Sequence, residues 1–447
     1  MSKWRDASVG ECFDLENGFA FKSSDFRDKG VPVIKIKNVK AGHFSSHEFD
    51  FVDPSFVSLR PSKVARRGDL LISMSGNRHD GSPETWVGKV APFRSDAPHL
   101  INQRVGALRL KAGTDVDVAF AGYMLSSWSY QQHFIAVATS SGGQANLSPA
   151  QILSVRMQLP DIRSQRAIGE LLGFLDDKIA LNRQMNETLE AMAQAIFRDW
   201  FIDFGPTRRK TECATDPLEI MGGLITDAER AQQLADLFPA SFGDKGLPKG
   251  WKAGVLGDLA KSAGATVDPS SIDPEMPYIG LEHMPRKSIA LAEWEAASKV
   301  SSTKAKFERG QVLFGKLRPY FHKVGVAPVD GVCSTDIVVL DAQAEGNRPL
   351  IAALVSTEEF VAFTDQGSTG TKMPRTSWAN MKRYEVAVSD GAVSGAYGSI
   401  AGPLLDGIVS NIHENRTLAA TRDLLLPKLM SGEIRLQEAD EVLEAAQ

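Results

Sequence analysis

The sequence predicts an α+β protein. Two β-rich globular domains are expected to be separated by two long, antiparallel, coiled-coil-like helices, forming an internal pseudo-two-fold repeat. The first observation behind this prediction is the length of 447 residues, which exceeds what one hydrophobic core usually organises. The second is that a segment with helical spacing at 177–189 recurs at 406–418. The third is that each copy follows a glycine-rich block with strand-like patterns.

The repeat sets the expected domain organisation. We expect a first globular domain at 1–160, a spacer helix at 161–206, a linker with a short helix at 207–246, a second globular domain at 247–392, and a C-terminal spacer helix and tail at 393–447. The formal net charge of −5 argues by itself against a strongly basic nucleic-acid binder. However, the first globular domain carries +4 and the second is neutral, so the negative charge belongs to the helical segments.

The two helical segments match without a gap, although chance similarity of two amphipathic helices is the alternative explanation. The coinciding pairs are Asp177/Asp406, Ile179/Ile408, Asn182/Asn411, Asn186/Asn415, Thr188/Thr417 and Leu189/Leu418. The globular blocks also share a pattern, because 67–72 and 309–314 both place a short apolar run after an Arg-Gly pair. Alternating apolar and basic residues at 31–37 predict a strand with one solvent-exposed face.

The first long helix is predicted from a proline-free stretch of 164–201 with apolar residues every three or four positions. Asp161 or Ser164 can cap its start. In the second helix we expect Pro403 to lie in the first turn and Pro427 to kink or end the helix. Arg422 interrupts its apolar stripe, so we expect the pairing to loosen there.

Both copies keep two asparagines within the apolar stripe: Asn182 and Asn186 in the first, and Asn411 and Asn415 in the second. A buried asparagine in a helical seam reduces stability but fixes the register of the pairing. We therefore expect these four residues to fix the helix register, the alternative being that they lie at the solvent-facing edge.

Catalytic signatures are scarce. The sequence contains no HExxH, no GxSxG and no Walker phosphate loop, and the eight histidines are scattered. Asp161, Asp176 and Lys178 formally resemble a nuclease pattern, and a magnesium-dependent nuclease remains an alternative function. That chemistry, however, needs carboxylates on adjacent strands, and here they fall in a helix. Three widely spaced cysteines and the lack of a long apolar run are typical of a cytoplasmic protein outside the membrane.

Both globular blocks contain side chains suited to nucleic-acid recognition. Arginine and lysine suit guanine edges, amides suit adenine, and hydroxyl groups suit phosphates. Each loop alone could equally be a solvated turn, but the equivalent placement in both blocks favours recognition. The candidates are Lys35, Lys37, Ser75, Asn77, Arg78, Gln103, Arg104 and Gln144 in the first block, and Lys316, Arg318, Tyr320, Lys323, Thr369, Thr371, Lys372 and Arg375 in the second.

Four segments together resemble the specificity subunits of type I restriction–modification systems: 195–206 (AIFRDWFIDFGP), 247–251 (LPKGW), 317–320 (LRPY) and 425–434 (LLPKLMSGEI). The resemblance implies two target recognition domains that each read one half of a split double-stranded DNA sequence. It also implies a helical spacer that docks two methyltransferase subunits, with restriction/translocase subunits completing the endonuclease complex.

On this resemblance the chain is a non-catalytic subunit. It would hold no metal and no cofactor of its own, because S-adenosylmethionine, ATP and Mg²⁺ would belong to the partner subunits. Trp200 and Phe201, within the first matching segment, become candidates for partner docking. A helical scaffold for protein interactions is the remaining alternative, although it does not explain why a globule followed by a helix occurs twice.

Overall fold

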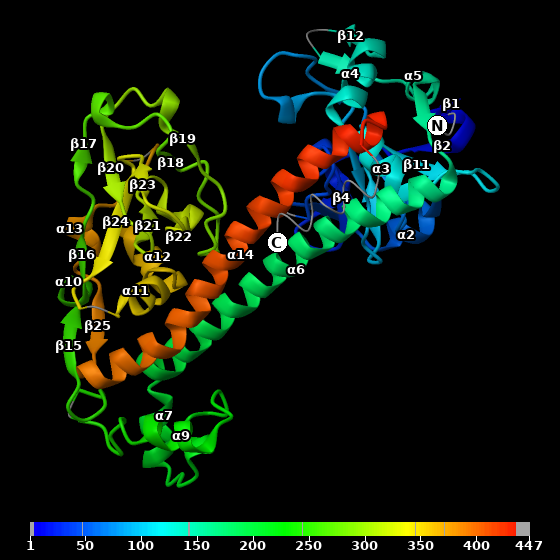
Figure 1. Cartoon of the computed structure of the whole chain (residues 1–447). Helices are drawn as coiled ribbons and strands as arrows, with labels where there is room; N and C mark the ends of the chain where they lie inside the picture. Colours follow the sequence, from blue (N-terminus) through cyan, green and yellow to red (C-terminus); the bar gives the residue numbers. More distant parts are fainter. Residues whose placement is uncertain are drawn as a thin grey trace. The chain divides into compact units, whose positions relative to one another are not determined.

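The computed structural model describes residues 4–434, except residues 47, 142–143, 244, 345 and 371. The chain forms two compact units, which we call unit 1 (Met1–Asp177 and Leu418–Gln447) and unit 2 (Lys178–Thr417). Each unit contains one globule with sheets and a part of both long helices (Figure 1). This mixture of sheets and two long helices confirms the predicted α+β class. Among the described residues, no helix combines the length and the apolar character needed to cross a membrane.

The strands of unit 1 are short. Their bounds are β1 Arg5–Ser8, β2 Phe13–Asn17, β3 Phe26–Arg27, β4 Val31–Ile34, β5 Asp50–Val52, β6 Val64–Ala65, β7 Leu70–Ser73, β8 Ser75–Gly76, β9 Val90–Pro92, β10 His99–Ile101, β11 Val105–Leu110, β12 Thr139–Ser141, β13 Gln144–Asn146 and β14 Arg156–Leu159. They form sheets in the orders β2-β11-β7-β9, β3-β5-β4-β10-β6 and β12-β13-β8, together with a β1-β14 pair.

The strands of unit 2 are arranged in a similar way. Their bounds are β15 Lys252–Val255, β16 Ala260–Ser262, β17 Thr266–Val267, β18 Pro277–Ile279, β19 Glu295–Ala296, β20 Lys304–Phe307, β21 Val312–Gly315, β22 Val324–Val326, β23 Gly331–Cys333, β24 Ile337–Ala342 and β25 Glu385–Val388. The sheets have the orders β16-β24-β21-β22 and β17-β20-β23-β18-β19, with a β15-β25 pair.

Each unit also contains short helices. In unit 1 they are α1 Val9–Cys12, α2 Ser55–Leu59, α3 Val118–Ser126, α4 Trp128–Val137 and α5 Pro149–Ser154. In unit 2 they are α7 Gly205–Thr211, α8 Pro217–Ile220, α9 Ala228–Ala235, α10 Leu256–Leu259, α11 Arg348–Val355, α12 Glu358–Gln366 and α13 Trp378–Met381. The segment 207–246, which was expected to hold one short helix, thus holds α8, α9 and most of α7.

The two globules share most of their topology, although the fifth strand of the five-stranded sheet, β3 or β17, lies at opposite edges. The four-stranded sheets correspond strand by strand, and each five-stranded sheet contains one parallel pair, β4 with β10 and β18 with β23. The turns before β7 and β21 are also alike. Gly68 and Gly310 adopt φ of 93° and 82°, which is the left-handed region that favours glycine. The next side chain, Asp69 or Gln311, accepts a 2.9 Å hydrogen bond from the backbone N–H three residues earlier.

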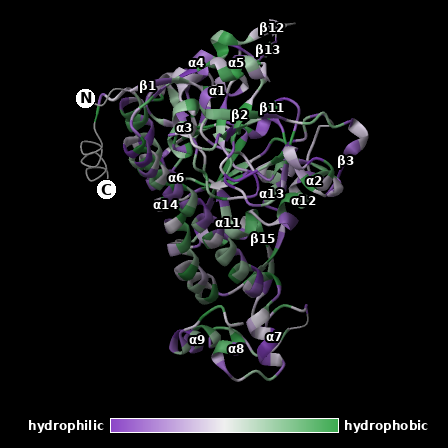
Figure 2. Cartoon of the chain, turned by 90° about the vertical axis from the view of Figure 1, so that its right-hand side faces the viewer, coloured by the Kyte–Doolittle hydropathy of each residue, from purple (hydrophilic) through white to green (hydrophobic). Residues whose placement is uncertain are grey.

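The long helices are α6 (Ile162–Phe197), which continues as a π-helical turn at Arg198–Ile202, and α14 (Gly391–Ser431). Both show hydrophilic and hydrophobic residues interspersed along their length, as expected for amphipathic helices (Figure 2). Their antiparallel pairing is established by contacts inside each unit. In unit 2 the Tyr397 hydroxyl donates to the Ala193 carbonyl oxygen at 3.1 Å, and in unit 1 Arg422 contacts Asp176.

The expected position of Pro403 in α14 is wrong, and so is a helix end at Pro427, while a kink at Pro427 stays a prediction. Pro403 does not lie in the first turn, because the helix begins at Gly391. Pro427 does not end the helix, which continues to Ser431. Tertiary packing explains both differences, since Tyr397 and Ala401 before Pro403, and Leu425 and Leu429 around Pro427, are buried in the cores of their units. Burial of this kind outweighs the hydrogen bond that proline removes.

Candidate nucleic-acid interface

In unit 2 the two predicted recognition segments meet. The strand-exit loop (316–323) follows β21, and the hairpin loop (368–376) follows α12. Arg375 forms isolated β-bridges with both Leu317 and Thr369. The Arg318 N–H donates to the Pro374 carbonyl oxygen at 2.7 Å, and the Thr376 N–H donates to that of Lys316 at 3.1 Å. The backbone therefore fixes these two loops against each other.

Arg375 is held by a residue that the sequence analysis missed. A nitrogen of its guanidinium lies 3.1 Å from an Asp336 carboxylate oxygen, and the side chains are 55% and 29% exposed, respectively. Asp336 belongs to a third segment, the connection 334–336 between β23 and β24, whose backbone accepts from the Lys316 N–H at 2.7 Å. Three segments thus converge around one guanidinium that remains partly open to solvent.

Arg318 and Tyr320 lie on a strained turn. Arg318 and His322 both adopt positive φ, of 52° and 51°, on either side of a 3₁₀ turn at Pro319–Phe321. Non-glycine residues in this region cost free energy and cluster at functional sites. The Arg318 Nε is buried without a hydrogen-bond partner in the described part of the chain, whereas the Tyr320 side chain is 51% exposed.

The other candidates of unit 2 are not equivalent. The Lys323 ammonium donates to the Leu281 carbonyl oxygen, and burial lowers the pKa of Lys323, so this residue has a structural partner. Thr369 pairs with Arg375 through its backbone at 3.0 Å, and both Thr369 and Lys372 are exposed. Thr371 lies outside the described residues.

Unit 1 builds the same arrangement from different residues. Its strand-exit loop (74–79) pairs with its hairpin loop (139–146) through Ser75 and Asn146, whose side chains are 2.8 Å apart. The connection 102–104 takes the place of 334–336, because the Met74 N–H donates to the Arg104 carbonyl oxygen at 2.9 Å. The Arg104 guanidinium donates to the Gln144 side-chain oxygen at 3.1 Å.

The remaining candidates of unit 1 are divided between solvent and structural contacts. Gln103 is exposed, and Asn77 donates to the Thr85 hydroxyl at 2.9 Å. The Arg78 guanidinium donates to the Ala138 carbonyl oxygen. Lys35 lies 2.7 Å from Asp50, and Lys37 lies 4.0 Å from the same carboxylate. These two lysines follow β4, whose last residue, Ile34, accepts a 3.0 Å hydrogen bond from the Asn102 N–H. The backbone therefore places them beside the connection 102–104, although their described ion pairs are with Asp50.

The four asparagines of the long helices meet in the seam of unit 2. The Asn182 amide donates to Asn415 at 3.0 Å and to Glu414 at 2.7 Å, and the Asn411 amide donates to Asn186 at 2.9 Å. Asn182 and Asn186 are each 4% exposed. The contact that register fixing requires is therefore present, while the register role itself stays a prediction.

Arg422 joins α14 to α6 in unit 1, contrary to the expected loosening. Its guanidinium lies 2.7 Å from Asp176, and Tyr123 donates to the same carboxylate at 2.6 Å.

The positions of Asp161 and Asp176 also bear on the nuclease alternative. Asp161 caps the start of α6 by accepting from the Ser164 N–H at 3.1 Å, about 22 Å along the helix from Asp176 at 1.5 Å per residue. The two carboxylates therefore cannot share a metal ion.

Trp200 and Phe201 lie in the core of unit 2. They are 1% and 7% exposed, and their rings contact Phe238, Trp251 and Tyr397. A side chain enclosed by its own chain cannot contact a partner without rearrangement. The structure therefore does not support the expected docking role for these two side chains.

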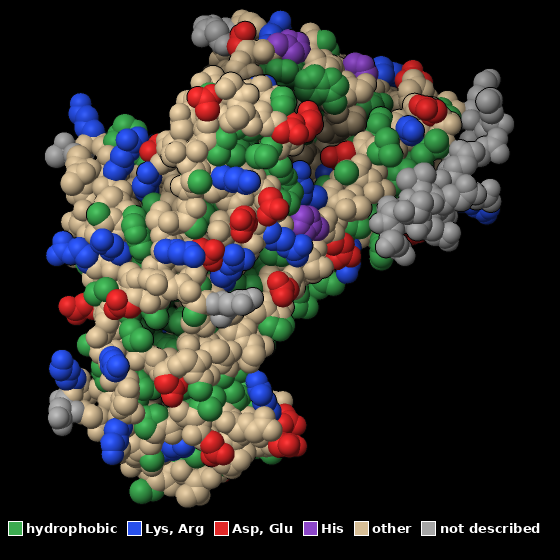
Figure 3. Space-filling view, turned by 60° about the vertical axis from the view of Figure 1, so that its left-hand side comes forward, with side chains coloured by type: hydrophobic (Ala, Val, Ile, Leu, Met, Phe, Trp, Pro, Cys, Tyr) green, Lys and Arg blue, Asp and Glu red, His purple; other side chains and the backbone are tan. Residues whose placement is uncertain are grey.

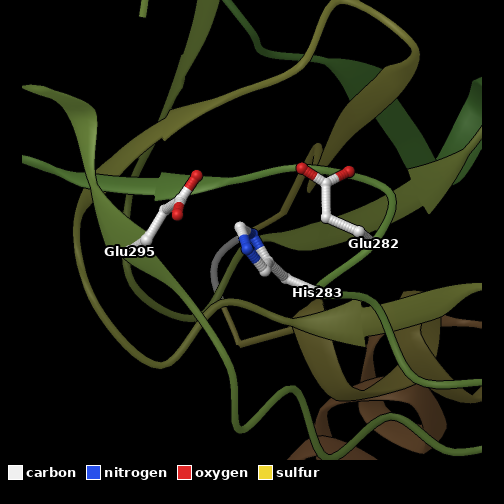
Figure 4. A group of neighbouring side chains, drawn as sticks. All are labelled: Glu282, His283 and Glu295. Atoms are coloured by element: carbon white, nitrogen blue, oxygen red, sulfur yellow. The ribbon is translucent and has the colours of Figure 1, made fainter. Parts of the chain in front are cut away.

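Glu282, His283 and Glu295 form a cluster in unit 2 whose possible ligand atoms all lie within 4.8 Å of one another. The two glutamates lie on opposite sides of the histidine ring (Figure 4). His283 Nδ1 accepts a 2.9 Å hydrogen bond from the Gly280 N–H. A metal-binding histidine normally donates its second ring N–H instead. Binding a cation through Nε2 would require loss of the remaining ring proton, so this cluster is poorly suited to a metal.

The surface charge is mixed on the face that Figure 3 shows. Lys and Arg side chains are interspersed with Asp and Glu over the face seen in Figure 3. Some basic side chains that appear available in the sequence are neutralised by neighbours, as Lys35 is by Asp50.

Asp336 could have been found from the repeat alone. It directly precedes the buried strand β24, as Arg104 directly precedes β11 in the first block.

Comparison with known proteins connects this arrangement to one group. Residues 1–191 match the model of the type I restriction modification DNA specificity domain. The chain is 23% identical to the type I restriction enzyme HindI specificity subunit of Haemophilus influenzae, over 97% of this chain and 100% of that protein. It is 22% identical to the MjaIX specificity subunit of Methanocaldococcus jannaschii, over 67% of this chain and 65% of that one.

The fold has a counterpart among solved structures. The crystal structure of a type I restriction-modification S subunit from M. genitalium superposes with a TM-score of 0.54 at 15% sequence identity. The match covers 96% of both chains. At this identity the likeness concerns the fold, and it includes both globules and both long helices.

Proposed function

The chain belongs to the family of type I restriction–modification specificity subunits, and from this premise we propose that each unit reads one half of a bipartite double-stranded DNA target. As a specificity subunit it is a non-catalytic component of its complex. The recognition domains are the segments 1–160 and 247–392, and the segments 161–206 and 393–447 form the spacer, with 207–246 as a linker. S-adenosylmethionine, ATP and Mg²⁺ act in the partner subunits, and the complex works in the cytoplasm.

The observation that carries this proposal is the repeated three-segment arrangement. In both units a strand-exit loop, a hairpin loop and an inter-strand connection are joined by the same backbone hydrogen bonds, yet their side chains differ. A common backbone with different polar groups suits two readers of different sequences, because donors and acceptors at base edges determine which base pair is bound.

The spacer role rests on the helix pair. Asparagines buried in its seam oppose sliding of one helix along the other, because any shift would leave their amides unpaired. A pair of fixed register can set the distance between two half-sites. We further propose that the exposed faces of α6 and α14 dock two methyltransferase subunits, to which restriction/translocase subunits add. Phe174, Leu181 and Leu424 supply apolar surface there, with exposures of 63%, 55% and 52%.

The test is a methylation assay on DNA of random sequence. The full chain, assembled with its methyltransferase subunits and supplied with S-adenosylmethionine, should modify sites that share a split, asymmetric motif with a spacer of fixed length. Exchanging 247–392 for the corresponding segment of another specificity subunit should change one half of that motif and leave the other intact. Methylation of a continuous motif, or a motif that changes in both halves, would contradict the proposal.

A further inference from the structure

In both units one guanidinium is held between two of the three converging segments. In unit 1 it is Arg104, which donates to Gln144 at 3.1 Å. In unit 2 it is Arg375, which lies 3.1 Å from Asp336. Each pair joins an inter-strand connection to a hairpin loop, so each closes the same gap in its unit.

The backbone establishes that these pairs join corresponding segments, although Arg375 aligns with Asn146, two residues after Gln144, because Thr376 and Leu147 donate to the equivalent Lys316 and Met74 carbonyl oxygens. The Arg104 carbonyl oxygen accepts a hydrogen bond from the Met74 N–H, and the Asp336 carbonyl oxygen accepts one from the Lys316 N–H. Met74 and Lys316 are the first residues after β7 and β21. Gln144 lies in β13, which pairs with the strand-exit loop of unit 1. Arg375 likewise bridges the strand-exit loop of unit 2.

The cation and its acceptor exchange places between the units. In unit 1 the arginine comes from the inter-strand connection and the acceptor from the hairpin. In unit 2 the arginine comes from the hairpin and the acceptor from the connection. The arrangement therefore preserves one anchored guanidinium at each site while it changes the segment that supplies it.

An anchored guanidinium is suited to reading a guanine. Its five N–H groups form a planar fork, of which one nitrogen is engaged in each pair, so others remain to bind the O6 and N7 acceptors of guanine. Anchoring limits the rotamers of a flexible side chain before DNA arrives, which favours one base over a diffuse phosphate contact. At 55% exposure the Arg375 side chain is accessible.

Resting on the proposed function, we propose that Arg104 and Arg375 each read a guanine in their half-sites, and that Gln144 and Asp336 are the positioning residues that aim them. Asp336 acts through Arg375. It withdraws one guanidinium nitrogen from solvent and fixes the plane of the fork, but does not itself contact the base.

The experiment uses the full chain assembled with its methyltransferase subunits, S-adenosylmethionine and duplex DNA randomised at every position of the motif. Asp336→Ala should reduce the preference for guanine at one position of one half-site by roughly tenfold to a hundredfold. Asp336→Asn keeps an oxygen acceptor, as Gln144 does in unit 1, and should retain most of the preference. Gln144→Ala should weaken guanine preference in the other half-site only.

Two comparisons keep the outcome clear. Arg383→Ala removes an exposed arginine of unit 2 and should lower methylation of all sequences alike, if at all. Unfolding temperatures identify a variant that fails for lack of stability, in which case Asp336→Asn carries the test. A uniform loss with Asp336→Ala, or an unchanged base preference, would overturn the inference. Absence of a bipartite motif with the unaltered chain would instead overturn the proposed function.

Discussion

The Asn411 side-chain amide donates a 2.9 Å hydrogen bond to the Asn186 side-chain oxygen, joining α14 to α6 in the seam of unit 2. Ile179 and Ile408, at 6% and 1% exposure, are among the apolar residues of the same seam. A polar pair in such surroundings contributes little net stability but is costly to break, because the buried Asn186 side chain and the half-buried Asn411 amide would then lack a partner.

Removing one member of this pair should therefore destabilise the protein more than removal of the second member adds. Asn186→Ala should lower the free energy of unfolding by about 1–3 kcal/mol, since the Asn411 amide loses its acceptor. The double variant Asn186→Ala/Asn411→Ala should lose less than the sum of the two single variants. Denaturant unfolding of all four proteins measures this coupling. Gln184→Ala, at an exposed position of α6, is the control. Strictly additive losses would show that the pair is not coupled.

Lengthening the spacer should change the spacing between half-sites. Four helix-forming residues inserted after Gln184 and four after His413 preserve the pairing of Asn182 with Asn415 and of Asn186 with Asn411. They add about 6 Å to the helix pair, close to two base-pair steps. The methylated motif should keep both half-sites and tolerate a changed spacer. The insertion after Gln184 alone should instead lower the unfolding temperature. An unchanged spacing between half-sites with the double insertion would contradict the proposal that the helix pair sets this spacing.

Arg318 should affect one half-site only. If it contacts a base, Arg318→Ala should relax recognition there by about 1–3 kcal/mol, measured as the ratio of methylation rates for preferred and altered sites. Because Arg318 has φ of 52°, Arg318→Gly serves as a matched variant that lacks the side chain but accommodates this backbone. Both variants should lose the same discrimination. An equal loss for every sequence, largest at low salt and smaller at high salt, would make Arg318 a phosphate contact.

Glu190 should make the stability of unit 2 depend on pH. It accepts from the Ser288 hydroxyl at 2.9 Å and from the Ile289 N–H, and burial raises its pKa above the ordinary value of 4.5. A raised pKa in the folded state means that stability is fully present below the unfolded value and is lost as pH rises through the folded value. At neutral pH the buried carboxylate therefore carries a cost.

Glu190→Gln removes this charge and keeps a hydrogen-bond acceptor. The variant should unfold at a higher temperature than the unaltered chain at pH 7–8, and the difference should disappear below about pH 4.5. Glu212→Gln, at an exposed position, is the control. A lower unfolding temperature for Glu190→Gln at pH 8 would show that hydrogen bonds to the ionised carboxylate outweigh its desolvation.

The elements that could be predicted are those whose signal is local. The apolar spacing of α6 and the repeat of Asn182 and Asn186 in the second helix predicted two long helices, and the Arg-Gly turn predicted the strands β7 and β21. The start of α14 could not be predicted, because proline usually marks an early turn. Here the preceding turns are stabilised by Tyr397, whose partners lie far away in the sequence.

The sequence predicted which loops form the candidate site, but not which of their side chains are free to contact a ligand. The strand-exit and hairpin loops do meet, but sequence cannot show which basic side chains are already paired. Lys35 has an acidic neighbour in Asp50, and Lys323 donates to a carbonyl oxygen of its own unit. Trp200 belongs to a motif of the family resemblance, and motif membership does not distinguish a buried residue from an exposed one.

Unit 1 consists of two separate chain segments, and this affects how it folds during synthesis. Its core includes Leu425 and Leu429 from the far end of the chain, whereas unit 2 is one continuous segment, Lys178–Thr417. As the chain leaves the ribosome, the first globule must wait for some 240 further residues before its last helical turns are available. Unit 2 can complete its fold earlier. Until then the nascent first globule lacks Leu425 and Leu429, so the apolar surface that these residues cover is open to a chaperone or a partner subunit.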